Sequence, residues 1–543
     1  MGEVWPGLVP VVTVAVLVGA IHVPLGRYLH WVFTSPRHSR AERLVYRLVG
    51  VDPDVEQQWS VYALSVLAFS GVCLVALWLL IVLQGHLPGS FGRSMGLDTA
   101  FNTAASFVTN TNWQSYVGES GAGYLVAALG LTVQNFCSAG VGLAVAIAVI
   151  RGLVRQNADR IGNFWVDLTR SLIRLLLPLA AVGAVVLVLG GVIQNLAAPH
   201  AITTIDGGRQ VIQGGLVASQ EAIKLLGTNG GGVFGANSAH PFENPSGWTN
   251  LVEILLILAI PSALPRTYGL MVHDTRQGWA VASVMGALGI GGAALLSFLE
   301  VRGGCMEGVE QRFGPAWSGV FASITTSTST GAVDAAHESL APLAGGVATL
   351  NMMLGELSPG GVGSGLCAMV VMIVLTVFIA GLTVGRTPEL LGKTIGAAEI
   401  RLAALALLVA PALVLVGTGV ALVVPASRAA LSADGPSGLS EMLYAFTSAA
   451  NNNGSAFAGL AADQPFLNIV LGLVMLLGRF VPIVALLALA GSLAAQGRRP
   501  VTPGTMPTHT PTFVVFLLIV IVLVTGLTYF PSLALGPIAE ALS

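Results

Sequence analysis

Charged residues are scarce in this chain of 543 residues. Only 9% of the sequence is Asp, Glu, Lys or Arg, whereas a soluble globular domain carries roughly 25%. Apolar residues make up 54% of the chain, and the mean hydropathy is +0.80. A soluble fold of this size could not be so poor in charge, so the sequence predicts a polytopic membrane protein. The formal net charge of −2 gives no sign of a nucleic-acid partner.

Cysteine is rare as well. The four cysteines lie far apart, with no CxxC pair and no neighbouring histidine that would indicate a metal site or a redox motif. We interpret them as small apolar residues. They are Cys73, Cys137, Cys305 and Cys367.

Long apolar runs, by contrast, are abundant. Ten of them are long enough to cross a bilayer, which takes about 20 residues. The first follows acidic Glu3 and has no small-residue cleavage site, so we interpret it as a transmembrane helix and not as a signal peptide. The predicted spans are 8–30, 60–84, 124–150, 172–195, 249–271, 279–299, 345–380, 400–424, 466–491 and 512–531.

Four further amphipathic runs of about 12 residues are too short to cross. They cover 98–109, 216–227, 316–328 and 439–450, and another span follows each. We therefore expect an all-α polytopic fold of four fused units, each a span, a pore helix, a polar loop and a span, with one extra helix at each end. The predicted division is 1–58 (N-terminal helix and loop), 59–151 (repeat 1), 152–278 (repeat 2), 279–385 (repeat 3), 386–495 (repeat 4) and 496–543 (loop and C-terminal helix).

Basic residues gather in the connections on one side of this arrangement. By the positive-inside rule that side is the cytoplasm, which places both termini outside. These residues are Arg27, Arg37, Arg40, Arg43 and Arg47 after the first span, and Arg151, Arg155, Arg160, Arg170, Arg174, Arg266, Arg276, Arg386, Lys393, Arg401, Arg498 and Arg499 between repeats or after the last.

Each short run ends in an uncharged loop rich in Gly, Asn, Thr or Ser. The loops read Thr109-Asn-Thr-Asn-Trp-Gln114, Gly227-Thr-Asn-Gly-Gly-Gly232, Ser327-Thr-Ser-Thr-Gly-Ala332 and Ala450-Asn-Asn-Asn-Gly-Ser455. The aligned positions Asn112, Gly230, Gly331 and Gly454 are spaced by 118, 101 and 123 residues. One such loop alone is more often a turn. Four in equivalent places indicate a cation filter, because inward-facing carbonyls can replace an ion's hydration shell and glycine permits the backbone angles this needs.

A glycine-rich segment interrupts the long seventh span. Ser358-Pro-Gly-Gly-Val-Gly-Ser-Gly365 breaks the run midway, either as a kink or, as we prefer, as a discontinuous helix whose unwound part lies below the filter and blocks or diverts the ion. The glycines of this candidate gate are Gly360, Gly361, Gly363 and Gly365.

Three charged residues join this candidate gate. Arg479 stands within an apolar run and either forms an electrostatic barrier below the filter or snorkels to the cytoplasmic edge. Glu356, just before the glycine break, either holds an ion or pairs with an arginine, with a structural role as the alternative. Arg386 is expected to contact a partner or the gating segment.

Together these motifs resemble the KdpA family, the potassium-binding subunits of bacterial Kdp potassium-importing ATPases. Besides the four loops, Gly360-Gly-Val-Gly-Ser-Gly365, Val384-Gly-Arg-Thr-Pro-Glu389 and Leu477-Gly-Arg-Phe-Val-Pro482 are similar to that family, and the resemblance covers nearly the whole chain. It implies the fold of the superfamily of potassium transporters and K+ as the bound ion. The implied filter residues are Asn110, Thr111, Asn112, Gln114, Thr228, Asn229, Gly230, Ser329, Thr330, Gly331, Asn451, Asn452, Asn453 and Gly454.

The resemblance also implies a multi-subunit complex in the bacterial plasma (inner) membrane. Its members would be a P-type ATPase subunit (KdpB-like), a single-span accessory subunit (KdpC-like) and a small one-helix subunit (KdpF-like). This chain has no Asp-Lys-Thr-Gly-Thr phosphorylation motif, and Gly392-Lys-Thr lacks the upstream glycine of a P-loop. It is therefore expected to be a non-catalytic subunit that takes K+ from outside and passes it to the ATPase. The alternative is a self-sufficient potassium channel or ion-coupled symporter.

Overall fold

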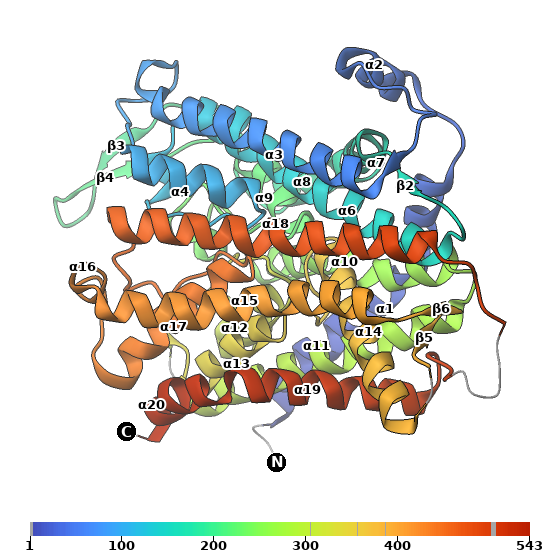
Figure 1. Cartoon of the computed structure of the whole chain (residues 1–543). Coiled ribbons are helices and arrows are strands. Elements are labelled where there is room, and N and C mark those ends of the chain that lie inside the picture. Colours follow the sequence, from blue (N-terminus) through green and yellow to red (C-terminus); the bar gives the residue numbers. More distant parts are fainter. Residues whose placement is uncertain (1–3, 305, 356, 386, 501–505, 543) are drawn as a thin grey trace.

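The fold is a bundle of membrane-crossing helices, seen here in a computed structural model (Figure 1). The structure describes residues 4–304, 306–355, 357–385, 387–500 and 506–542. Within them, ten helices are long and apolar enough to cross a membrane, which confirms the predicted all-α polytopic fold. Their helical segments are α1 (Val4–Thr34), α3 (Trp59–Val82), η2–α6 (Val126–Thr132 and Val133–Val154), α7–η3–α8 (Phe164–Arg170, Ser171–Leu176 and Leu177–Leu189), α10 (Gly247–Met271), α11 (Thr275–Gly303), α14 (Ser364–Val384), α15 (Ala397–Val423), α18 (Pro465–Ala495) and α19–η6–α20 (Pro511–Leu533, Ala534–Ile538 and Ala539–Leu542).

Four short helices lie among these spans at one end of the molecule (Figure 1). They are α4 (Leu97–Val108), α9 (Val217–Leu226), α12 (Gly314–Ser327) and α17 (Gly435–Ala450). Their bounds agree with the predicted short runs to within four residues. The remaining helical pieces are α2 (Arg40–Val49), η1 (Gln84–His86), α5 (Gly118–Gly121), η4 (Asn237–Ala239), η5 (His337–Ser339), α13 (Pro342–Met353) and α16 (Pro425–Arg428).

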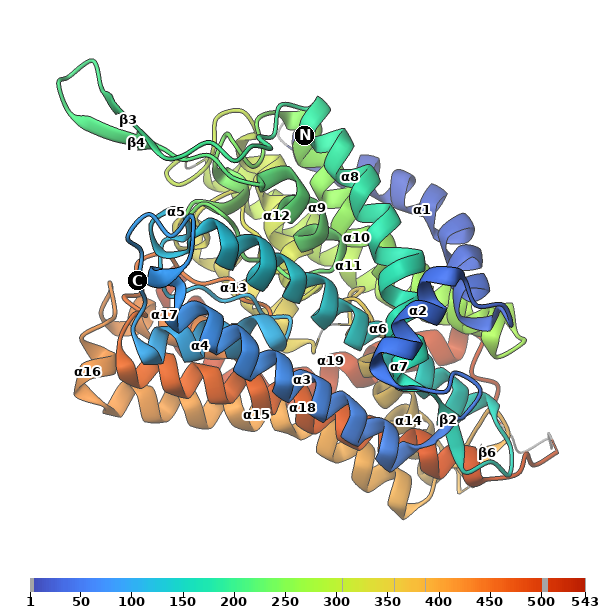
Figure 2. The same cartoon turned by 90° about the horizontal axis from the view of Figure 1, so that it is seen from above.

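The helix of residues 126–154 lies at the centre of the bundle (Figure 2). In its most apolar stretch 83% of the residues are buried, against 17% for the peripheral span Ala397–Val423. Helix α6 packs against α18, α7 and α4, while α1 packs along α10 and α15 along α18. The interior of the bundle is thus built around α6, and the outer helices present their apolar side chains to lipid.

The face opposite the short helices is tied together by buried charged groups. The Lys393 ammonium is fully buried and donates to the carbonyl oxygens of Gly152 and Leu493 at 2.8 and 2.6 Å, and to that of Arg155. A cation at the C-terminal ends of α6 and α18 complements their helix dipoles. Arg151 forms an ion pair with Asp167 on the same face.

Three spans differ from the prediction by more than four residues, and one of them, the tenth, continues to Leu542, eleven residues beyond its predicted end. The fourth begins at Phe164, eight residues before the predicted start, and so contains Arg170 in addition to Arg174. Arg174 pairs with Glu42 of α2, which is 132 residues away in sequence and provides a counter-charge that hydropathy cannot reveal. The seventh span is two helices, α13 and α14, joined by residues 354–363.

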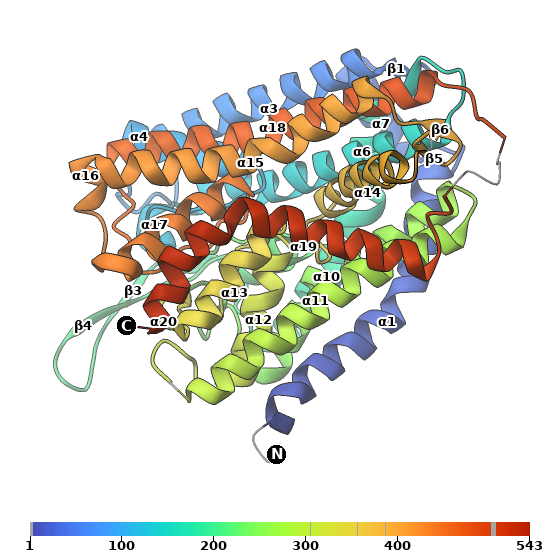
Figure 3. The same cartoon turned by 60° about the horizontal axis from the view of Figure 1, so that its bottom comes forward.

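Three short antiparallel ribbons complete the part of the fold that the structure describes. They pair β1 (Gln57–Gln58) with β2 (Arg160–Gly162), β3 (His200–Thr203) with β4 (Arg209–Ile212), and β5 (Glu389–Leu390) with β6 (Lys393–Thr394). The β3–β4 ribbon extends away from the helices (Figure 2). Figure 3 shows both chain ends toward the side of this ribbon and β5–β6 at the opposite side.

Candidate ion-binding site

Four loops follow the four short helices and share one backbone conformation. We call them loop 1 (109–114), loop 2 (227–232), loop 3 (327–332) and loop 4 (450–455). In each, an N–H group turns back to the carbonyl oxygen five residues earlier in the helix, at 2.8 to 3.1 Å, and so satisfies a carbonyl that the helix end leaves free. The donor and acceptor pairs are Thr111 and Ser106, Asn229 and Lys224, Thr330 and Thr325, and Asn453 and Ser448.

The loops also repeat a pattern of left-handed backbone. One residue in each has φ between 49° and 71°, and the residue two positions later has φ between 57° and 103°. The second position is the one that the sequence aligns, occupied by Asn in loop 1 and Gly in the other three. Such angles are rare outside glycine and asparagine, so their recurrence at four equivalent places marks one shared loop structure. The first positions are Asn110, Thr228, Ser329 and Asn452, and the second are Asn112, Gly230, Gly331 and Gly454.

The four loops meet in a closed ring. A Cβ atom added at Gly230 would lie 1.9 Å from the carbonyl oxygen of Thr330 in loop 3. The same construction at Gly331 meets loop 4, 2.1 Å from the oxygen of Asn453, and at Gly454 it meets loop 1, 2.0 Å from the oxygen of Thr111. Any side chain at these three positions would displace a carbonyl of the next loop. Glycine is therefore required by close approach as well as by backbone angle.

Loops 1 and 2 close the ring through side chains. The Asn110 amide donates to the carbonyl oxygen of Thr228 at 2.8 Å, and Gln114 exchanges two hydrogen bonds with the backbone of Gly232. Asn112 occupies the position that is glycine elsewhere, and its amide donates to Asn135 of α6 at 2.6 Å. The departure of loop 1 from four-fold symmetry thus has a structural counterpart in α6.

The surroundings of the ring are polar but uncharged at the loops themselves. The filter residues implied by the sequence are buried, apart from Gln114 and Gly454, which are half-buried. Tyr444 links His337 to Ser455, whose hydroxyl donates to Asn453. Burial lowers the pKa of His337 to about 4, so this chain of hydrogen bonds is neutral at physiological pH. The C-terminal end of each short helix meanwhile directs partial negative charge toward the ring.

The connection between α13 and α14 lies against this ring. The N–H of Val362 donates to the Thr228 hydroxyl at 2.9 Å, and that of Gly360 donates to the carbonyl oxygen of Ser327 at 3.0 Å. Gly363 has φ of 89°, and a Cβ atom there would lie 2.1 Å from the carbonyl oxygen of Gly142 in α6. The connection is held between loops 2 and 3 on one side and the central helix on the other. Gly361 belongs to it, and Gly365 lies in the first turn of α14.

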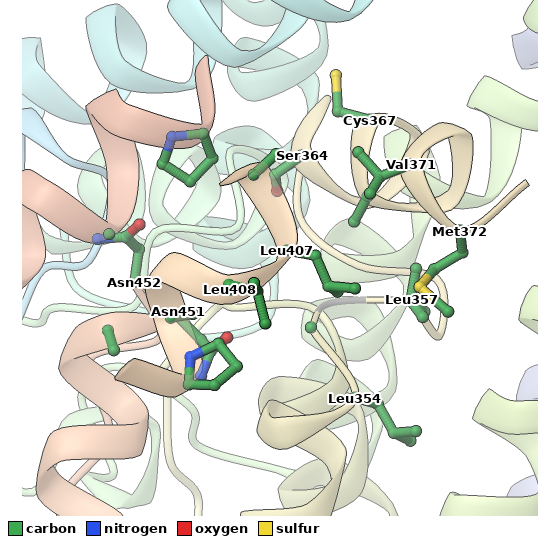
Figure 4. Close-up of a pocket in the computed structure, with 18 of the residues that line it drawn as sticks. Leu354, Leu357, Ser364, Cys367, Val371, Met372, Leu407, Leu408, Asn451 and Asn452 are labelled. Carbon is green, nitrogen blue, oxygen red and sulfur yellow. The ribbon is translucent and has the colours of Figure 1, made fainter. Parts of the chain in front are cut away.

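A cavity of about 160 Å³ lies beside loop 4 and this connection (Figure 4). Asn451 and Asn452 lie on one side of the view, while Cys367, Val371 and Met372 of α14 lie on the other. Arg479 of α18 also lines the cavity and is buried, with 8% of its surface exposed. A Cβ atom at Gly142 would lie 3.2 Å from its Nη2 atom, so the guanidinium sits next to α6 and close to the α13–α14 connection. Glu356 and Arg386 lie outside the described residues.

Supporting residues on α6 escape prediction from the loop motifs alone. Ser138 donates to Asn110 at 2.7 Å, and Asn135 receives the hydrogen bond from Asn112. The sequence contains only a weak indication of these supporting residues. Gln134, Asn135 and Ser138 are polar residues within a largely apolar helix. All three are buried. In a spanning helix, buried polar groups of this kind usually face a partner.

Comparisons with known proteins give consistent results. A family described as "Potassium-transporting ATPase A subunit" matches residues 11–542. A "Potassium-transporting ATPase potassium-binding subunit" from Kineococcus radiotolerans is 56% identical, over 100% of this chain and 99% of its own length. One from Streptomyces coelicolor is 54% identical over 100% of both chains. The crystal structure of the potassium transporter TrkH from Vibrio parahaemolyticus aligns with a TM-score of 0.54 and 15% identity, covering 87% of this chain and 97% of that one, which shows a shared fold.

Proposed function

The chain belongs to the KdpA family of potassium-transporting ATPase A subunits, and from that membership we propose that it takes K+ from outside the cell and passes it to a P-type ATPase partner. K+ is then the transported ion and the ring of four loops its selectivity filter. The chain would be a non-catalytic subunit of the ATPase complex, located with both termini outside in the bacterial plasma membrane.

One observation carries this assignment of the site. Three aligned glycines each leave just enough room for a carbonyl oxygen of the next loop, and Asn110 and Gln114 join loop 1 to loop 2, so the four loops form one closed ring of backbone and side-chain oxygens. Rings of carbonyl oxygens replace the hydration shell of K+. We assign the filter to Asn110, Thr111, Asn112, Gln114, Thr228, Asn229, Gly230, Ser329, Thr330, Gly331, Asn451, Asn452, Asn453 and Gly454.

The α13–α14 connection is proposed as the gate below this filter. A pump must stop ions from leaking back through the pathway by which they enter, and a loop bound to Thr228 and Ser327 is well placed to interrupt that pathway. Arg479 would add an electrostatic barrier next to the same connection. Partners of the KdpB, KdpC and KdpF type complete the proposed complex.

The test is ATP hydrolysis by this chain co-expressed with a P-type partner. We expect stimulation by K+, and we expect Gly230→Asp to shift it to much higher K+ concentration because the new side chain would collide with the Thr330 carbonyl. Gly247→Asp is the matched control for an added carboxylate, since Gly247 is exposed in the first turn of α10, where an acidic side chain complements the helix dipole, and a Cβ atom there comes no closer than 3.8 Å to the Arg312 carbonyl oxygen. Potassium flux through the purified chain alone, with no ATPase response, would instead favour an independent channel or symporter.

A further inference from the structure

A fully buried lysine breaks the four-fold symmetry of the ring. Lys224 is the residue of α9 whose carbonyl oxygen accepts the hydrogen bond from Asn229. The equivalent residues of the other short helices are all small hydroxyl residues: Ser106, Thr325 and Ser448. The Lys224 side chain has no exposed surface. Because an unpaired buried charge is very costly, this one position calls for a local explanation.

The Lys224 ammonium lies in a cage that uses all three of its hydrogens. Its Nζ atom is 2.7 Å from Glu221, 2.9 Å from Glu243 and 2.9 Å from the side-chain oxygen of Asn237. Both carboxylates and Asn237 are themselves buried. Glu253 of α10 is also fully buried and close enough to act electrostatically on Lys224. One cation therefore faces three carboxyl groups directly behind loop 2.

The same cage holds the backbone on the outer side of loops 2 and 3. Glu243 accepts a hydrogen bond from the Phe234 N–H at 2.9 Å, and its carboxylate lies 3.0 Å from the place that a Cβ atom on Gly232 would take. Asn237 accepts hydrogen bonds from Lys224 and, at 3.3 Å, from the N–H of Val333, which directly follows loop 3. Lys224 is thus tied to loop 2 through its own carbonyl and through Glu243, and to loop 3 through Asn237.

We propose that Lys224 and its cage are a positioning device that holds loops 2 and 3 in register and thereby sets how well the ring distinguishes K+ from Na+. The inference rests on the proposed function of the ring. Discrimination between the two ions depends on where the coordinating oxygens are held, and a supporting shell that is loose by about 1 Å is enough to spoil a site. A hydroxyl residue at this position could not reach Glu243 and Asn237 together, because only a long side chain spans from α9 to both.

The experiment compares Lys224→Met with Lys393→Met in the complex with the P-type partner. Both lysines are fully buried, and each ammonium has three partners, but Lys393 binds helix ends on the opposite face. We expect Lys224→Met to raise the K+ concentration for half-maximal ATP hydrolysis about tenfold and to narrow the K+/Na+ ratio, while kcat changes by less than about twofold. Lys393→Met should lower the thermal midpoint and leave the half-maximal K+ concentration unchanged.

A second variant covers the case in which Lys224→Met does not assemble. Glu221→Gln keeps the side-chain volume and the contacts of Lys224 with Glu243 and Asn237, and we expect a smaller shift of half-maximal K+ in the same direction. A wild-type half-maximal K+ and K+/Na+ ratio in whichever variant assembles would overturn the inference. So would an equal shift in Lys393→Met. A wild-type complex with no K+ response would instead overturn the proposed function, and this inference with it.

Discussion

At the scale of single residues, the ring of four loops depends on three positions that exclude any side chain. Gly230, Gly331 and Gly454 each face a carbonyl oxygen at about 2 Å from where a Cβ atom would stand, closer than any side chain tolerates. Asn112 is the exception, and its side chain is bound to Asn135. Loop 1 therefore has the same backbone conformation as the other three loops and an additional hydrogen bond to α6. The four loops place their oxygens similarly, but the contacts that hold loop 1 differ from those that hold the others.

Asp334, three residues beyond Gly331, gives a prediction on pH. Burial raises the pKa of this carboxyl group from its ordinary value of 3.8 to about 8, outweighing the hydrogen bond from Asn250 and the charge of Arg312. Between about pH 4 and pH 8 the folded protein holds a proton that the unfolded chain has lost, so the free energy of unfolding falls as pH rises through this window. We expect Asp334→Asn, which mimics the neutral acid, to weaken this dependence.

The measurement is the thermal midpoint of the purified protein from pH 5 to pH 9, wild type against Asp334→Asn. The wild-type midpoint should fall more steeply toward pH 8 than that of the variant. Parallel curves would mean that Asp334 is ionised in the folded state throughout, contrary to the effect of its burial.

At the scale of helices, hydropathy and length predicted most of the fold. Ten spans and four short helices were predictable because a crossing helix needs a fixed number of apolar residues and a polar loop marks where a short one ends. The exposed β3–β4 ribbon was not, since its strands bury no side chain and carry no alternation that a core would impose. Nor was the cage of Lys224, because its partners Glu243 and Asn237 belong to a loop whose path the sequence leaves open.

The candidate site could also be predicted in part from the sequence. The equivalence of the four loops was visible in their composition and order, whereas the order of contacts around the ring required coordinates. Long-range partners such as Asn135 for Asn112, or Glu42 for Arg174, arise from helices that pack side by side. A single sequence records which residues are polar and does not record which of them meet.

The contact between α6 and the α13–α14 connection gives a prediction for the proposed gate. A Cβ atom at Gly142 would lie 2.3 Å from the carbonyl oxygen of Val362, and backbone cannot yield as a flexible side chain can. We expect Gly142→Ala to reduce stability by about 1–3 kcal/mol, as overpacked interiors do, and to displace the connection. The measurement is passive K+ flux into vesicles without ATP. We expect this flux to be higher for Gly142→Ala than for the wild type, because a displaced gate should leak.

Gly140→Ala is the matched control on the same helix. The new Cβ atom would there meet the end of the Leu168 side chain, at 2.9 Å, and this side chain can rotate away. Its passive flux should equal that of the wild type. Equal flux in the two variants would contradict a blocking role for the connection.

At the scale of the whole molecule, topology links the ring to the direction of transport. The ten spanning helices among the described residues place both chain ends on one side of the membrane, and in Figure 3 that is the side of the β3–β4 ribbon. The four loops follow helices that lie toward the same end (Figure 1). Lys393, which binds the carbonyl oxygens at the ends of α6 and α18, lies toward the other end. If the basic connections are cytoplasmic, the ring opens outward and the gate faces inward, as uptake requires.

That orientation is testable with reporter fusions. Alkaline phosphatase is active only on the outer side of the inner membrane. Green fluorescent protein fluoresces when it stays in the cytoplasm, and it does not fluoresce efficiently when the general secretion pathway carries it across the membrane. We expect phosphatase activity from a fusion at the C-terminus and from an insertion after Gly207 at the tip of the β3–β4 ribbon, and fluorescence from an insertion after Asn157, between the third and fourth spans. The reverse pattern at all three positions would turn the ring toward the cytoplasm. The protein would then be oriented to select ions leaving the cell, and a role in uptake would be excluded.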